Sequence, residues 1–116
     1  MTGNGVLTRN EWKTALDRIT EEQKGEHVTI EVLDPEVGHQ YEAERLPFAY
    51  LTYDPKDDAA IVAVGGQSAR YPVVLRHIIP HPTEIDVATE DIPEPAVRIV
   101  ASDGTITLIT FFKAES

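Results

Sequence analysis

The chain has 116 residues, of which 20 are acidic and 10 basic, and its net charge is −10. This length fits one domain that buries its own core. The acidic balance argues against binding to nucleic acids or to anionic membranes, because both carry negative charge. The chain contains no cysteine, which excludes disulfides, thiolate nucleophiles and cysteine-ligated zinc.

Nothing in the sequence indicates a membrane or secretory segment. It contains no run of about 18 apolar residues, the length that a membrane-spanning helix requires. The first twelve residues, MTGNGVLTRNEW, lack the basic start and the apolar stretch of a signal peptide. We therefore expect a cytoplasmic protein.

Residues 8–24 predict an amphipathic helix that follows an N-terminal arm, residues 1–7. Thr8 and Glu11 have the spacing of a capping box, in which each residue bonds the backbone N–H of the other. Gly25 is a typical residue for the helix end. The apolar residues Trp12, Ala15, Leu16 and Ile19 recur at helical spacing and form one stripe. The helix therefore needs a surface to cover.

Residues 26–113 predict antiparallel β-structure, because apolar residues alternate with polar ones. The segments 39–46 and 48–54 read as separate strands, and Tyr50 and Tyr53 should point to opposite faces because they are three apart. Gly65-Gly66 predicts the end of a strand, followed by a loop over 66–72. Asp34-Pro35 and Asp54-Pro55 favour turns between strands.

The hairpin signal over 96–112 is the strongest in the chain. Asp103-Gly104 between two alternating segments predicts a type I′ turn. Short links throughout favour antiparallel neighbours. We expect a mainly β (α+β) single domain over 1–116. Its N-terminal amphipathic helix should pack on a curled antiparallel sheet or small open barrel of about six to seven strands.

Several segments occur in the order seen in one protein family. They are Glu11-Trp12, VTIEVLDPEVGHQYEA over 28–43, Leu46-Pro47, HPTEIDV over 81–87 and DGTITLITF over 103–111. Over nearly its whole length the chain resembles a family of small uncharacterised bacterial proteins, a domain of unknown function. The resemblance implies a bacterial, single-domain protein without an assigned activity or catalytic residues. His77 matches a histidine-bearing strand of that family, whereas His81 has no match.

His77 and His81 are four apart, which is the spacing of a zinc half-site on a helix. Pro80 would break a helix that spans them. In an extended strand the two positions lie about 13 Å apart, whereas metal ligands lie about 2 Å from the ion. We therefore predict no metal site and no cofactor.

Four residues remain as candidates for a ligand or interface site, namely His77, Tyr71, Arg76 and Asp86. The sequence offers no motif that assigns a catalytic residue. We expect a small acidic binding module without catalytic activity, which binds a partner protein, a second copy of this chain in a homodimer, or a small ligand. A structural or stress-related accessory protein without a ligand is another possibility. The alternative is a small enzyme or metal-binding protein that uses His77 with nearby carboxylates, Asp86 or Glu84.

Overall fold

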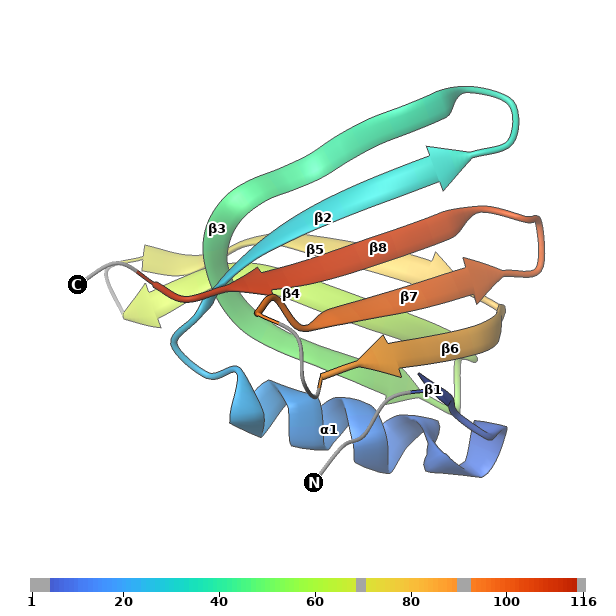
Figure 1. Cartoon of the computed structure of the whole chain (residues 1–116), viewed down its shortest axis with the longest axis horizontal. Coiled ribbons are helices and arrows are strands. Elements are labelled where there is room, and N and C mark those ends of the chain that lie inside the picture. Colours follow the sequence, from blue (N-terminus) through green and yellow to red (C-terminus); the bar gives the residue numbers. More distant parts are fainter. Residues whose placement is uncertain (1–4, 69–70, 90–92, 115–116) are drawn as a thin grey trace.

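The computed structural model describes residues 5–68, 71–89 and 93–114. These ranges hold one helical segment and eight strands that pair only in antiparallel fashion, in the order β1-β6-β7-β8-β2-β3-β4-β5 (Figure 1). The elements are β1 (Gly5–Val6), the 3-10 helix η1 (Arg9–Glu11), α1 (Trp12–Glu22), β2 (His27–Asp34), β3 (Gly38–Asp54), β4 (Ala59–Ser68), β5 (Tyr71–Pro80), β6 (Pro82–Ala88), β7 (Ala96–Ala101) and β8 (Ile106–Phe112).

Strand β3 bends the sheet into two layers. Its first part pairs with β2 as far as Pro47, and its second part pairs with β4 from Phe48 onward. In Figure 1 the strand curves from one layer into the other. The large layer is therefore β1-β6-β7-β8-β2-β3 and the small layer is β3-β4-β5. The sheet curls without closing, so β1 and β5 lie at its edges.

A second corner joins the small layer back to the large one. His81 is the single residue between β5 and β6, and its φ of 49° lies in the left-handed region. Its N–H donates to the Asp58 carbonyl at 2.8 Å, and its carbonyl accepts from the Ser102 N–H at 2.9 Å. The chain therefore reverses between Pro80 and Pro82 without losing its backbone hydrogen bonds at His81.

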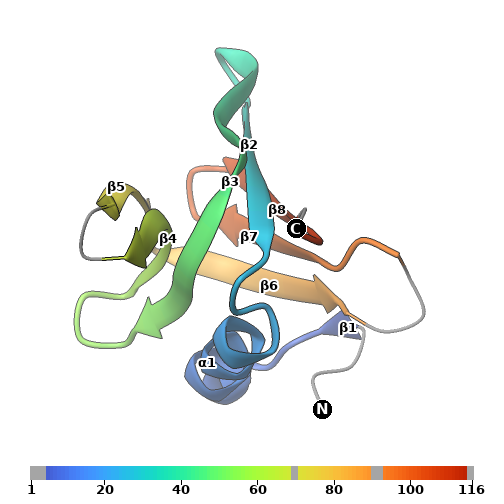
Figure 2. The ribbon, with the colours of Figure 1, turned by 90° about the vertical axis from the view of Figure 1, so that its left-hand side faces the viewer.

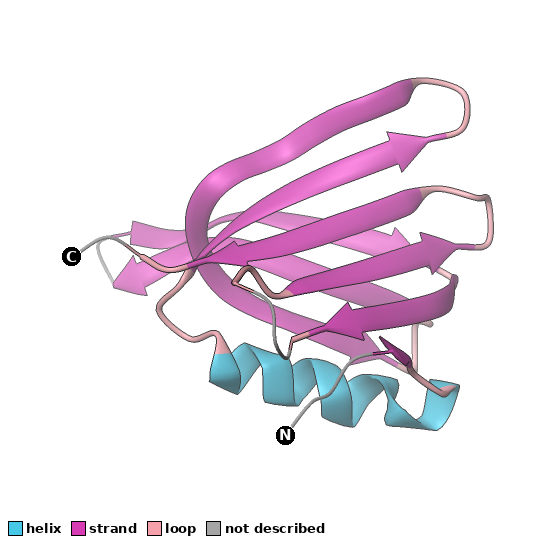
Figure 3. Ribbon diagram, viewed as in Figure 1, coloured by secondary structure: helices cyan, strands magenta, loops and turns pink. Residues whose placement is uncertain are grey.

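The helical segment closes the gap that the bend leaves beside the second part of β3. The Glu11 carboxylate accepts from the Thr8 N–H at 2.9 Å, as the capping box predicts. The predicted stripe contributes three buried side chains, Trp12, Leu16 and Ile19. Figures 2 and 3 show α1 beneath the sheet, between β3 and β1. Its length of 11 residues is too short to cross a membrane, and no other described helix is long enough.

The core fills the space between the two layers and the helix. It consists of the inward-facing residues of the strands together with the helix stripe, including Ile30, Leu51, Val62, Ile99 and Phe111. Tyr53 is buried in this core, whereas Tyr50 is only half-buried. The two tyrosines therefore point to opposite faces, as their spacing predicts.

The sheet has eight strands where the sequence predicted six to seven. The N-terminal arm contributes β1, whose two residues pair with Asp86 and Val87 of β6. The segments 39–46 and 48–54 form one continuous strand of 17 residues. Strand β4 continues beyond Gly65 to Ser68, so most of the predicted loop over 66–72 belongs to strands. A two-residue strand and a bent strand have little periodicity of their own, which explains these differences.

The type I′ prediction for the last hairpin is wrong. Of the two turn residues only Gly104 has a positive φ, 89°, whereas a type I′ turn needs a positive φ at both. The Gly104 N–H donates to the Ala101 carbonyl, and the Ala101 N–H donates to the Thr105 carbonyl. These bonds enclose a three-residue loop that uses the left-handed glycine as its last residue.

Candidate functional site

One face of the large layer packs on the core. No other described element covers the opposite face, which we call the outer face. Residues directly opposite each other in paired strands share a face. By this register the outer face consists of His39 and Tyr41 on β3, His27, Thr29, Glu31 and Leu33 on β2, Ile106, Leu108, Thr110 and Phe112 on β8, Ala96, Arg98 and Val100 on β7, and Glu84, Asp86 and Ala88 on β6.

A hollow of about 360 Å³ opens on the outer face where β8, β2 and β3 lie side by side. Its lining combines aromatic, hydroxyl and charged side chains, namely Thr29, Glu31, Tyr41, Glu44, Arg45, Thr110 and Phe112. Such a mixture allows both packing and polar contacts with a ligand.

Bulges in β3 build one wall of this hollow. The register with β2 shifts on both sides of Ile30, so β3 carries extra residues between Tyr41 and Leu46. Arg45 has a φ of 48°, and its N–H donates to the Thr29 hydroxyl at 3.1 Å. Its guanidinium lies over the Phe112 ring, 3.9 Å from the centroid. Because bulges turn side chains away from the regular alternation, Arg45 lies over β8 instead of following its own strand.

The carboxylates of the hollow have few partners. Glu31 Oε1 lies 2.9 Å from His39 Nε2, and this pair is charged on both sides only when the histidine is protonated. Among the described residues, neither Glu44 nor Arg45 forms an ion pair. The hollow therefore presents charged groups that the protein itself leaves largely unneutralised.

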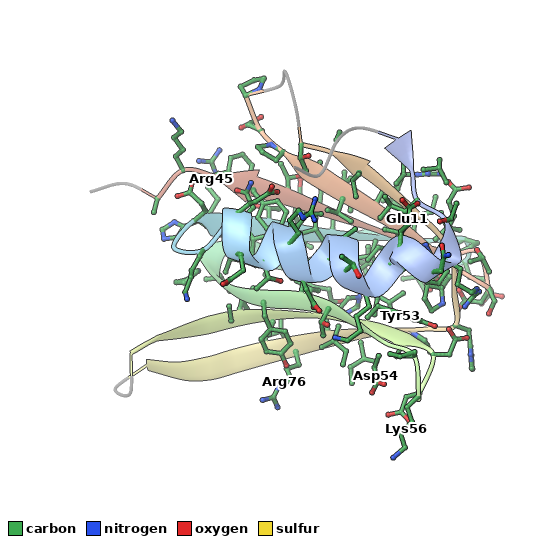
Figure 4. The ribbon with its side chains drawn as sticks, turned by 90° about the horizontal axis from the view of Figure 1, so that it is seen from below. Glu11, Arg45, Tyr53, Asp54, Lys56 and Arg76 are labelled. Carbon is green, nitrogen blue, oxygen red and sulfur yellow. The ribbon has the colours of Figure 1, made fainter. Side chains whose placement is uncertain are left out.

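A second polar cluster, which we call the corner cluster, surrounds Asp58 at the other end of the molecule. Asp58 Oδ1 accepts from the Tyr53 hydroxyl at 2.6 Å and from Arg9 at 3.2 Å, and Oδ2 lies 3.2 Å from His81 Nδ1. Arg9 also donates to the Pro82 carbonyl at 3.3 Å. Figure 4 shows Tyr53 near Glu11, at the opposite end of α1 from Arg45.

The corner cluster shifts two protonation equilibria. Hydrogen bonds from Tyr53 and His81 lower the pKa of Asp58, and the Arg9 charge adds to this effect. The Asp58 carboxylate in turn raises the pKa of Tyr53, and burial acts in the same direction. Asp58 has a φ of 49°, like His81. The cluster therefore ties helix η1, the β3–β4 turn and the β5–β6 corner together around one carboxylate.

The four site residues predicted from sequence lie on two strands, with Tyr71, Arg76 and His77 on β5 and Asp86 on β6. Arg76 lies on β5, where its Nε donates to the Tyr50 hydroxyl at 2.9 Å (Figure 4). Asp86 lies on β6 in the outer face, with its carboxylate 3.9 Å from Arg98. Tyr71 begins β5, but its side chain lies outside the described residues. The described contacts bring none of these residues to His77.

His77 lies opposite the fully buried Val62, so it faces the core side of the small layer. Burial lowers the pKa of its imidazole, and the negative charge of Glu42 opposes this effect. The carboxylate that influences His77 is therefore Glu42, and neither Asp86 nor Glu84 of the large layer contributes. Within the described ranges no three histidine or carboxylate side chains gather closely enough to hold a metal ion.

Sequence reasoning did not find the hollow or the corner cluster. The spacing of residues along β3 does carry one sign of the hollow. The inward-facing residues Ala43 and Phe48 are an odd number of positions apart. An odd interval between two inward residues of one strand indicates a bulge. The corner cluster offers no comparable signal, since Arg9, Asp58 and His81 come from three distant segments.

The comparisons with known proteins support the family resemblance. An uncharacterized protein from Aquifex aeolicus (strain VF5) is 31% identical over 100 residues, which cover 86% of this chain and 84% of the relative. No solved structure matches the chain. The model of the DUF5335 family, a family of unknown function, matches residues 4–116. The chain therefore belongs to the DUF5335 family.

Proposed function

We propose that this protein is a non-catalytic binding module that holds a partner protein on its outer face. The observation that carries this proposal is the hollow, which lies on a sheet face that no described element covers. A helix packs only on the opposite side of the sheet, so the face stays accessible to a partner.

The composition of the outer face supports the proposal. Leu33 is 41% exposed and Tyr41 is 53% exposed, and Leu108, Ile106 and Phe112 are half-buried on the neighbouring strand β8. Ordered charges border these apolar residues, as in the Arg98–Glu84 pair at 2.7 Å. Protein interfaces typically combine an apolar, aromatic centre with a polar rim. The net charge of −10 disfavours nucleic acid and anionic membranes as partners.

Site-specific photo-crosslinking in the native cell tests this proposal. A benzophenone amino acid at Leu108 or Thr110 should crosslink one defined partner protein. The same amino acid at Thr14 or Lys56, which are exposed away from the outer face, serves as the control. Equal capture of that partner from the control positions, or no capture from the outer face, would contradict the proposal.

A second copy of this chain is the other partner that we propose to test. The crosslinked product would then have twice the mass of the chain, and light scattering should detect a dimer at high concentration. A monomer at every accessible concentration would remove self-association and leave a different protein as the partner. A cytoplasmic location is part of the same proposal, since a chain without cysteine suits a reducing compartment.

An enzyme or metal-binding role for His77 is the second candidate. The observation that favours it is the burial that lowers the pKa of His77, because a neutral imidazole can accept a proton or bind a metal ion. Elemental analysis of the purified protein tests the metal role. A stoichiometric metal that is lost in the His77→Ala variant would favour this candidate over the binding module.

A further inference from the structure

We infer that the hollow on the outer face receives a lysine or arginine side chain from a basic segment of the partner protein. The inference rests on the proposed function and adds the chemistry of the partner. It follows from the charges in the hollow, from its aromatic wall and from the charge of the whole chain.

The carboxylates supply the first argument. Glu31 has a side chain only 21% exposed, and the exposed His39 bonds one of its two carboxylate oxygens. Glu44 lines the same hollow and forms no ion pair with a described residue. An ion pair between a partly buried carboxylate and a cation of the partner is stronger than an exposed pair, because water screens the two charges less at a partly buried position.

Arg45 does not serve as the cation that neutralises these carboxylates. Its guanidinium lies over the Phe112 ring, and its backbone is fixed by the hydrogen bond to Thr29. No carboxylate oxygen of the described residues lies within ion-pair distance of it. The lining therefore holds two carboxylates and one guanidinium that neutralises neither directly.

Tyr41 supplies the second argument. It is 53% exposed, and its ring packs against His39 at 4.9 Å between centroids. This contact holds an aromatic wall beside the carboxylates, where a cation can lie over the ring face. The hollow of about 360 Å³ is at the small end of ligand pockets, which range over roughly 300–1,000 Å³, so one long side chain suits it.

The overall charge supplies the third argument. At −10 the chain attracts a basic segment from a distance and repels an acidic one. An acidic side chain in the hollow would also meet Glu31 and Glu44 at close range. The charges near the hollow and those of the whole chain therefore favour the same class of partner.

Four capped pentapeptides test the inference, each with glycine and serine around a central lysine, arginine, glutamate or norleucine. They are titrated into the isotope-labelled full chain at neutral pH and low ionic strength, and the backbone amide signals are followed by NMR. The lysine and arginine peptides should shift the signals of Thr29, Glu44 and Thr110 saturably, and added salt should weaken their binding.

Three variants locate the binding site. Glu44→Gln and Tyr41→Leu should each weaken binding of the lysine peptide about two- to fivefold, the range for one exposed ion pair or cation–π contact. Asp57→Asn in the exposed β3–β4 turn removes the same formal charge far from the hollow and should leave the affinity unchanged. An equal loss for Asp57→Asn would mean that only net charge matters, and it would overturn the inference.

Two further results would also overturn the inference. The glutamate peptide could bind at the hollow and lose its affinity in the Arg45→Gln variant, in which case the occupant is acidic. Alternatively, none of the four peptides could cause saturable shifts. Neither result decides the proposed function, because crosslinking from Leu108 and Thr110 tests the outer face without any assumption about charge.

Discussion

The Thr20 hydroxyl joins both backbone groups of Leu51 to the helix. Thr20 Oγ1 donates to the Leu51 carbonyl at 2.6 Å and accepts from the Leu51 N–H at 2.9 Å. Strand β2 pairs with β3 only as far as Pro47, so this edge of β3 has no neighbouring strand at Leu51. One helix side chain thus replaces the missing strand, which fixes how α1 lies beneath the bend.

Replacement of this hydroxyl should destabilise the fold. We expect Thr20→Val to lower the free energy of unfolding by about 1–3 kcal/mol, because two backbone groups of a buried residue lose their partner. Urea unfolding measures the change. Thr20→Ser keeps the hydroxyl and should recover most of the stability, and Thr14→Val on the exposed side of the helix is the matched control. A loss as large in Thr14→Val would contradict the role of the Leu51 bonds.

The corner cluster should make the stability of the fold depend on pH in the acidic range. The pKa of Asp58 in the folded chain lies below its ordinary value of 3.8 because Tyr53, His81 and Arg9 favour the charged form. A lowered carboxyl pKa contributes stability above the unfolded-state pKa, and this contribution is lost as the pH falls through the folded-state pKa.

We therefore expect Asp58→Asn to be less stable than the wild type at neutral pH, with a difference that shrinks as the pH falls below 3.8. Asparagine tolerates the left-handed backbone at this position, so the substitution tests mainly the charge. Unfolding in urea across this pH range measures the difference. A difference that stays constant down to the lowest pH would contradict the link to Asp58 ionisation.

His77 should titrate below its ordinary pKa of 6.5 because it is half-buried. The unfolded chain then takes up the proton more readily, so this group lowers stability as the pH falls below 6.5. An NMR titration of the imidazole signals measures the pKa directly. Glu42→Gln should lower the pKa further, because the Glu42 charge favours the protonated ring, whereas Glu44→Gln should leave it unchanged. A higher His77 pKa in the Glu42→Gln variant would show that a charge other than Glu42 dominates the titration of this imidazole.

Two glycines allow a matched test of turn geometry. Gly25 and Gly104 both have a φ of 89°, but an added Cβ meets Pro35 Cγ at 3.3 Å only in Gly104. Alanine at either position should cost about 1–2 kcal/mol, since an L-residue is strained in this region. Thermal unfolding should show the larger loss for Gly104→Ala. An equal or smaller loss there would mean that Pro35 moves aside freely.

Much of the fold could be predicted because its signals are local. The capping box of Thr8 and Glu11, and the apolar stripe with Trp12 and Leu16, placed the helix within two residues of its observed bounds. The Asp34 and Asp54 carboxylates accept from backbone N–H groups two residues later, as turn-forming aspartates do. The segment around Pro80 and Pro82 is two strands with a break between them, as predicted.

The sites could not be predicted because they depend on register and on distant contacts. The spacing of His77 and His81 says nothing about Asp58, which lies 23 positions before His81 and bonds its ring. Arg45 reaches Phe112 only because a bulge turns it out of the alternation of β3. Neither contact produces a recognisable pattern among neighbouring residues of the sequence.

By itself the sequence determined most element types, their antiparallel pairing and the acidic charge, because period, caps and turn residues act within a few positions. The tertiary structure alone decided where β3 bends, which edge α1 covers and which side chains meet at the hollow and at the corner cluster. These choices depend on burial and hydrogen bonding between segments such as Thr20 and Leu51, which are 31 positions apart.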